Sequence, residues 1–69
     1  MDLTNKQLSR LIRAVYDEPQ LQNAIEAVLI EGLSIYRAEQ LFDQKHKTLG
    51  YKVNRVKKQI ELIKFVMGN

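Results

Sequence analysis

The apolar residues of this chain recur at intervals of three and four, a spacing that places side chains on one face of an α-helix. The first such segment follows Thr4 and Gln7, whose separation is that of a capping box, and predicts a helix over residues 5–16. The same separation recurs at Asp17 and Gln20, where we expect a second helix to begin. No segment shows the alternation typical of a β-strand.

The second and third helices are delimited by residues with defined roles at helix ends. Pro19 suits the first turn of the second helix, where a missing N–H loses no partner, and Gly32 suits a left-handed cap at its end. Ser34 is the expected N-cap of a third helix of about two turns. The apolar face of that helix should consist of Ala38, Leu41 and Phe42.

A polar stretch at residues 43–46 predicts a turn, and a long fourth helix is expected from Lys47 to the end of the chain. Its apolar residues step by four and three, which gives one unbroken stripe. The members of this stripe are Leu49, Val53, Val56, Ile60, Ile63 and Met67. Gly50 lies inside this helix at a cost of up to about 1 kcal/mol relative to Ala, so we expect another part of the chain to approach it closely.

Length and composition place these four helices in one small domain. With 69 residues there is room for a single core, so we treat residues 1–69 as one all-α, four-helix domain. The chain has no Cys and one His, which excludes disulfides and leaves too few ligands for an ordinary structural zinc site. Because a core of this size is marginally stable, we expect a homodimer to add further burial.

The formal net charge of +3 is distributed very unevenly along the chain. Residues 1–43 hold four basic and seven acidic side chains, a net charge of −3, whereas residues 44–69 hold seven basic and one acidic side chain, a net charge of +6. Such asymmetry is typical of a protein that binds a polyanion, but a solvated basic helix face explains it equally well at this point.

A short helix, a tight turn and a longer basic helix form a helix-turn-helix, in which the second helix enters the major groove of DNA. The polar face of the last helix would then reach the base edges. We expect base contacts from Lys47, Thr48, Tyr51, Asn54 and Arg55, and phosphate contacts from Arg37, Lys45, Lys52 and Lys58. His46 lies in the same turn, where a solvated surface position explains it better than a phosphate contact.

Two short runs flank the predicted helix-turn-helix: V-L-I-E-G at residues 28–32 and V-N-R-V at residues 53–56. They resemble the V-L-V-x-G helix end and the closing V-N-R-V of the KorA/TrfB-type plasmid repressors, and the PapB-type pilus regulators are similar in outline. Phe42 and Asp43 stand where that pattern has Gly, and Ala38 comes one position early, which predicts a turn longer by one residue. The resemblance implies transcriptional repression by a homodimer on a palindromic operator.

The final two turns of the last helix are apolar on more than one face. Leu62, Phe65 and Val66 lie off the main stripe, and excess apolar surface of this kind commonly contacts a partner chain. We therefore expect residues 59–69 to contribute to the homodimer through these three side chains.

Other classes of function have weaker support in the sequence. An enzyme is not expected, because there is no Cys, no Gly-rich phosphate loop and no pair of carboxylates on an apolar helix face. We expect no cofactor, metal or small-molecule effector, and the short apolar runs predict a cytoplasmic protein outside the membrane. The alternative that stays open is a small helical module, of phage or plasmid origin, that binds an acidic host-protein surface through the same basic helix.

Overall fold

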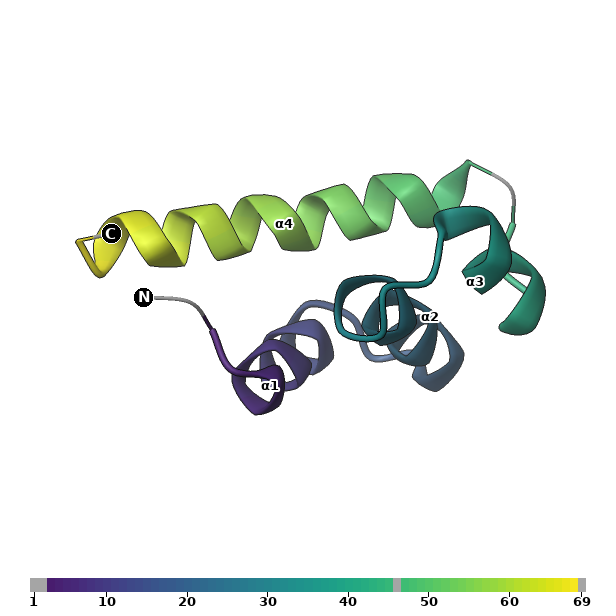
Figure 1. Ribbon diagram of the computed structural model, residues 1–69, viewed down its shortest axis with the longest axis horizontal. Coiled ribbons are helices and arrows are strands. Elements are labelled where there is room, and N and C mark those ends of the chain that lie inside the picture. Colours follow the sequence, from purple (N-terminus) through teal and green to yellow (C-terminus); the bar gives the residue numbers. More distant parts are fainter. Residues whose placement is uncertain (1–2, 46, 69) are drawn as a thin grey trace.

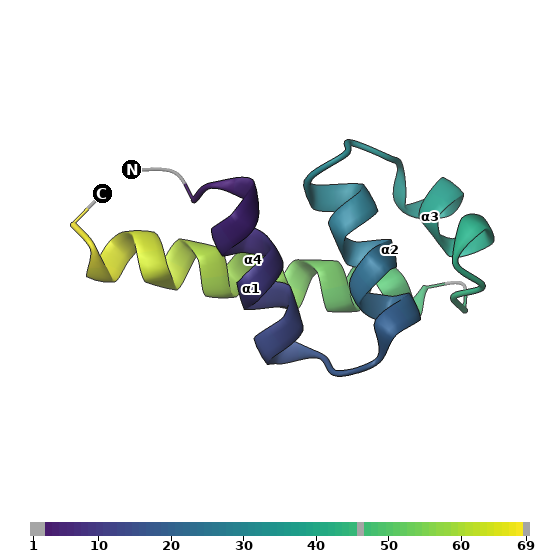
Figure 2. The same ribbon diagram turned by 90° about the horizontal axis from the view of Figure 1, so that it is seen from below.

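The computed structural model describes residues 3–45 and 47–68, and the regular structure of these residues is entirely helical. The helices are α1 (Asn5–Val15), α2 (Pro19–Leu29), α3 (Ile35–Leu41) and α4 (Thr48–Val66). Both α1 and α2 cross one side of α4, and α3 lies beside the start of α4 (Figure 1, Figure 2). The last turns of α4 extend beyond α1 in both views. The prediction of a small all-α domain is confirmed.

The core is a cluster of aliphatic side chains between α4 and the other helices. Leu49, Val53 and Val56 of α4 are fully buried, as their stripe predicted. They pack with buried residues of the other three helices: Ile12, Leu21, Ala24, Ile25 and Ala38. Toward the end of α4 the stripe loses its cover, since Ile60 still packs against the core but Met67 is 49% exposed.

Local signals set the start of α1 and α2. The predicted capping box of α1 is present, because the hydroxyl of Thr4 accepts the N–H of Gln7 at 3.1 Å and the Gln7 side chain accepts the N–H of Thr4 at 2.9 Å. The predicted cap of α2 is wrong by one residue. Its N-cap is Glu18 rather than Asp17, because Pro19 takes the first helical position.

The link into α3 follows the sequence prediction, and the end of α3 departs from it. Gly32 has a φ of +80°, as expected of a left-handed residue after α2, and the Ser34 hydroxyl caps α3 by accepting a backbone N–H at 3.2 Å. Leu41 was expected on the apolar face with Ala38, but it is 62% exposed. The helix ends there, and Phe42 leaves the helical path and packs against the core instead.

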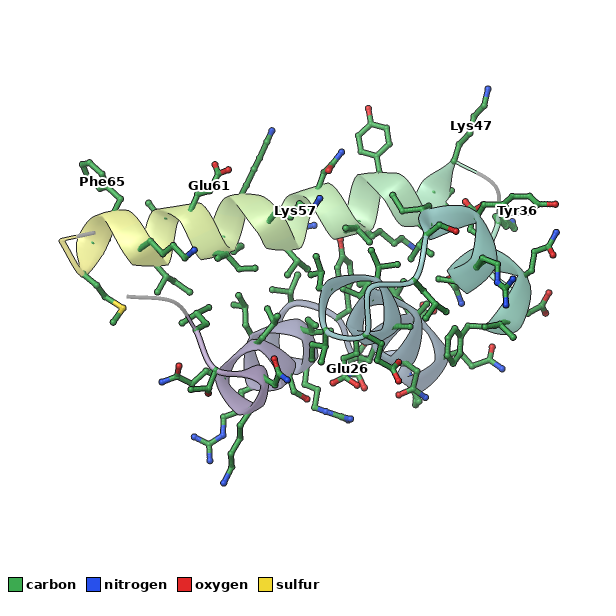
Figure 3. The ribbon with its side chains drawn as sticks, viewed as in Figure 1. Glu26, Tyr36, Lys47, Lys57, Glu61 and Phe65 are labelled. Carbon is green, nitrogen blue, oxygen red and sulfur yellow. The ribbon has the colours of Figure 1, made fainter. Side chains whose placement is uncertain are left out.

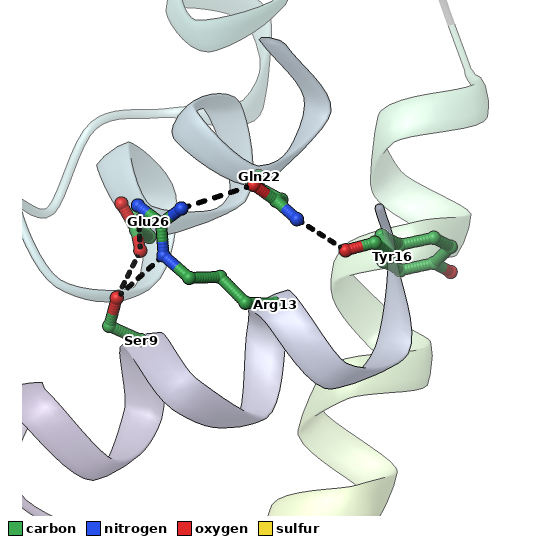
Figure 4. A network of polar contacts seen from close by, with 5 residues as sticks. All are labelled: Ser9, Arg13, Tyr16, Gln22 and Glu26. Carbon is green, nitrogen blue, oxygen red and sulfur yellow. Dashed lines mark hydrogen bonds and ion pairs between the residues drawn. The ribbon is translucent and has the colours of Figure 1, made fainter. Parts of the chain in front are cut away.

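A polar network joins α1 to α2 (Figure 4). The guanidinium of Arg13 donates to the Gln22 side chain at 3.3 Å and lies 3.7 Å from a carboxylate oxygen of Glu26. The Ser9 hydroxyl also donates to Glu26, and the Gln22 amide donates to the main-chain carbonyl of Tyr16. The nearly buried Gln22 is thus satisfied on both sides, and the two helices are held together outside the apolar core.

Gly50 lies in the first turn of α4, on the side that faces α3. The expected close approach of another element is absent there. A Cβ built on Gly50 would meet Cδ1 of Ile35 at 3.8 Å, which is an ordinary van der Waals distance. Packing at this position therefore does not require a glycine.

The Gly50→Ala variant should be more stable than the parent by about 0.5–1 kcal/mol, because Ala loses less conformational entropy on entering a helix. Urea denaturation followed by circular dichroism measures the free energy of unfolding. A decrease in that free energy would show that α3 packs more tightly on α4 in solution than a 3.8 Å contact allows.

Candidate nucleic-acid interface

The solvent-facing side of α4 carries a stripe that mirrors its buried one. We call it the outer stripe, and its members alternate in steps of four and three: Lys47, Tyr51, Asn54, Lys58 and Glu61. These positions precede the buried stripe by two residues, which is about 200° around a helix, and all of them are exposed. Figure 3 shows Lys47 and Glu61 directed away from the other three helices.

Several of the predicted base-contact residues lie on or beside this stripe. Tyr51 is 83% exposed despite its large apolar ring, and Asn54 follows it one turn later. Thr48 is also exposed, but its hydroxyl donates to the main-chain carbonyl of Lys45 at 2.8 Å and so helps to hold the turn. The oxygen of Thr48 can still accept a hydrogen bond from a ligand.

A shallow depression runs along the outer stripe. Its lining residues are Tyr51, Asn54, Arg55, Lys57, Lys58 and Glu61. All six belong to α4, so the depression is open surface between side chains of one helix rather than a cleft between elements. Three of the six are cations, which makes the depression suited to an anionic ligand.

Arg55 lies beside the outer stripe and leans toward the body of the domain. Its guanidinium carbon is 5.9 Å from the centroid of the Tyr16 ring, at the outer limit of a cation–π contact. Tyr16 is the C-cap residue of α1, so this contact links α4 to the end of α1. Arg55 also lines the depression, so its positive charge contributes to that surface.

The predicted phosphate-contact residues come from α3, from the turn and from α4. Arg37 on α3 and Lys45 in the turn are exposed, Lys58 lies on the stripe, and Lys52 is half-buried on the flank of α4. Lys57 also lines the depression and was missing from the predicted contacts. The sequence signal for it was its position next to Lys58.

Basic side chains predominate on this face, and Glu61 is the acidic member of the outer stripe. Residues 47–58 contain five basic and no acidic side chains. Within residues 3–45 and 47–68, none of the four lysines of this segment forms an ion pair. Their charges are therefore available to an external anion.

The turn into α4 is held by Glu39, which the sequence analysis did not identify. Glu39 is only 6% exposed, and its carboxylate oxygen Oε2 accepts the backbone N–H of Lys47 at 3.1 Å. Its main-chain carbonyl accepts the N–H of Gln44 at 2.8 Å. The first turn of α4 has no acidic residue, and its N-cap makes no side-chain hydrogen bond. Glu39 therefore supplies, from α3, the negative charge that a helix N-terminus favours.

The backbone of this turn departs from the prediction in length and conformation. The turn was expected at residues 43–46, but α3 ends at Leu41 and α4 begins at Thr48, so Lys47 is an N-cap rather than a helical residue. Asp43 and Lys47 have φ values of +53° and +73°, a conformation that costs roughly 1 kcal/mol for a residue other than Gly. His46 lies outside the described residues.

The residues predicted to form a dimer contact are exposed at the far end of α4. Phe65 is 79% exposed, and Val66 and Leu62 are also largely accessible. We call these three side chains the apolar end. Figure 3 shows Phe65 directed away from the other helices, as Lys47 and Glu61 are.

The part of the chain that the structure describes holds neither a metal site nor a membrane span. No group of three or more His, Asp or Glu side chains there is placed to hold a metal ion. None of its helices combines the length and the hydrophobicity needed to cross a bilayer.

Comparisons of the chain with known protein families, with curated proteins and with solved structures found no match. The interpretation of the outer stripe therefore rests on its geometry and charge.

The Glu39→Ala variant should be less stable than the parent by about 1–2 kcal/mol, because the N–H of Lys47 and the start of α4 lose their acceptor. The free energy of unfolding from urea denaturation measures this loss. Glu39→Gln is the matched control, since its amide oxygen can still accept the hydrogen bond and the loss should be smaller. Equal losses in the two variants would show that the hydrogen bond to Lys47 is not what stabilises the turn.

Proposed function

We propose that this chain is a sequence-specific regulator of transcription that binds double-stranded DNA through the outer stripe of α4. The observation that carries the proposal is the run of five basic and no acidic residues over positions 47–58, on a helix whose opposite face is buried. Because burial fixes the rotation of α4, Lys47, Lys57 and Lys58 face the solvent, and Arg55 and the half-buried Lys52 lie on the flank of the same helix. DNA has the dense negative charge that such a face attracts.

We call the exposed side of residues 47–58 the basic face, and its dimensions suit the major groove. That groove is about 12 Å wide and admits an α-helix. Residues 47–58 extend over about 16 Å of α4, which is roughly the length of five base pairs. Asn54 can bind adenine with two hydrogen bonds, Lys47 can bind guanine, and Tyr51 can contact a thymine methyl group or a phosphate. The basic face thus combines groups that attract DNA with groups that distinguish bases.

The conformation of the turn before α4 also supports the proposal, because it agrees with a helix-turn-helix. Phe42 and Asp43 stand where the KorA/TrfB-type pattern has Gly, and Asp43 has a φ of +53°, a conformation for which Gly is the residue best suited. Glu39 anchors the same turn to the first residue of the basic face. Repression is the regulatory effect that we propose, since a protein bound over a promoter excludes the polymerase without a further domain.

The alternative, a module that binds an acidic surface of a host protein, has less support from the exposed side chains. Protein interfaces depend on apolar and aromatic anchors. Between residues 47 and 58, Tyr51 is the one exposed large hydrophobic residue. The basic face therefore resembles a nucleic-acid interface more than a protein interface.

Binding should weaken steeply with salt, because each phosphate that the protein neutralises releases a counterion. If four phosphates are contacted, the association constant should fall by about two orders of magnitude between 50 and 200 mM salt. Fluorescence anisotropy with a labelled duplex measures it. An affinity that is independent of salt would contradict a role for the basic face in binding DNA.

Asn54→Ala should reduce the discrimination between the preferred site and other sequences by about 1–3 kcal/mol, because a base contact is lost. Lys58→Ala is the matched control on the same stripe. It should weaken binding to all sequences alike and lower the salt slope by about one. Anisotropy with duplexes selected from a random library measures both, and circular dichroism checks that helicity is unchanged. Equal weakening of all sequences by Asn54→Ala would show that Asn54 does not face the bases.

A further inference from the structure

One acidic side chain lies on the surface that the proposed function assigns to DNA. Glu61 is the one acidic residue of positions 44–69, and it belongs to the outer stripe with Asn54 and Lys58. It is exposed and lines the depression on α4, and Figure 3 shows it directed away from the other three helices. A carboxylate that approaches phosphates lowers the affinity for DNA unless it binds a hydrogen-bond donor. Attraction to the DNA backbone therefore does not explain Glu61.

The carboxylate of Glu61 has no partner within the domain. Lys57 and Lys58 precede it by four and three residues, the separations at which ion pairs form along a helix. Neither forms an ion pair with Glu61 in the part of the chain that the structure describes, and its carboxylate oxygens make no hydrogen bond there. Both oxygens can therefore accept a hydrogen bond from a ligand.

The rotation of α4 places Glu61 between two cations. At about 100° per residue, Glu61 lies about 20° from Asn54 around the helix axis, whereas Lys57 lies about 60° to the same side and Lys58 about 40° to the other. When Asn54 faces the bases, the two lysines are directed toward the phosphates at the two edges of the groove. Glu61 is then directed toward the base edges between those phosphates, where the repulsion from them is weakest.

The four bases differ in what their major-groove edges offer a carboxylate. Guanine presents two acceptors, thymine presents an acceptor and a methyl group, and adenine presents a donor beside an acceptor. Cytosine presents the donor of its N4 amino group. Because an ionised carboxylate only accepts hydrogen bonds, cytosine is the base that suits Glu61 best.

We infer that Glu61 is a specificity-determining residue of this interface and accepts a hydrogen bond from N4 of a cytosine. Glu61 follows Asn54 by seven residues, which is about 10 Å along α4 and roughly three base pairs of DNA. The preferred duplex therefore has a cytosine about three base pairs from the adenine that Asn54 binds. At duplexes without this cytosine the carboxylate faces acceptors, which weakens binding to them. The inference rests on the proposed function and names part of its DNA site.

Selection of duplexes from a random library, followed by anisotropy with the full chain, tests this inference. The loss of one preferred base in Asn54→Ala locates the adenine. About three base pairs from it, the parent should bind cytosine at least about fivefold more tightly than the other three bases. Glu61→Gln should reduce this ratio below about twofold and favour adenine, because a Gln amide binds adenine with two hydrogen bonds. It should also bind the other duplexes more tightly than the parent does, since the repulsion is removed.

Glu31→Gln is the matched control, because it removes the same charge from an exposed residue in the link between α2 and α3. It should keep the base preference of the parent, and circular dichroism should show the same helicity in all variants. Equal changes in affinity for all four bases in Glu61→Gln, with the preference for cytosine retained, would overturn the inference. A parent that recognises the adenine but prefers no cytosine near it would also overturn the inference while leaving the proposed function intact. A parent that binds all duplexes alike, or none, would refute the proposed function itself.

Discussion

The burial of Leu49, Val53 and Val56 against α1 and α2 is the constraint on which the rest of the molecule depends. Each fully buried aliphatic side chain stabilises the fold by about 1.5–3 kcal/mol. A shift of the pattern by one residue would turn α4 by about 100° and would bring Asn54 toward the core in place of Val53. The core therefore fixes the rotation of α4, and that rotation decides which side chains form the outer stripe.

The fold also gives the acidic and the basic side chains different surroundings. Carboxylates of the first three helices are used within the domain, as Glu26 is by Arg13 and Ser9, and Glu39 by the start of α4. The lysines of residues 47–58 have no such partner within the described part of the chain. A net charge of +3 therefore understates the positive potential around residues 47–58, which hold five basic and no acidic side chains.

Features that depend on neighbours in sequence were predictable, and features that depend on a second element were not. The capping box at Thr4, the cap at Ser34 and the left-handed Gly32 follow from local rules, and the buried stripe of α4 follows from helical periodicity. Leu41 and Phe42 are adjacent, and only the end of α3 decides which of them packs on the core. The Glu39 contact spans the turn and required the structure, because no local rule pairs Glu39 with the N–H of Lys47, eight residues later.

The turn into α4 shows how stability and the proposed function oppose each other at one residue. A positive φ at Lys47 costs roughly 1 kcal/mol that a glycine would avoid. A glycine there would also remove the first cation of the outer stripe. Strained backbone that persists at a binding surface must be stabilised by its surroundings, and here the Glu39 carboxylate accepts the N–H of that same residue. One buried carboxylate thus holds the strained residue in place and sets where the basic face begins.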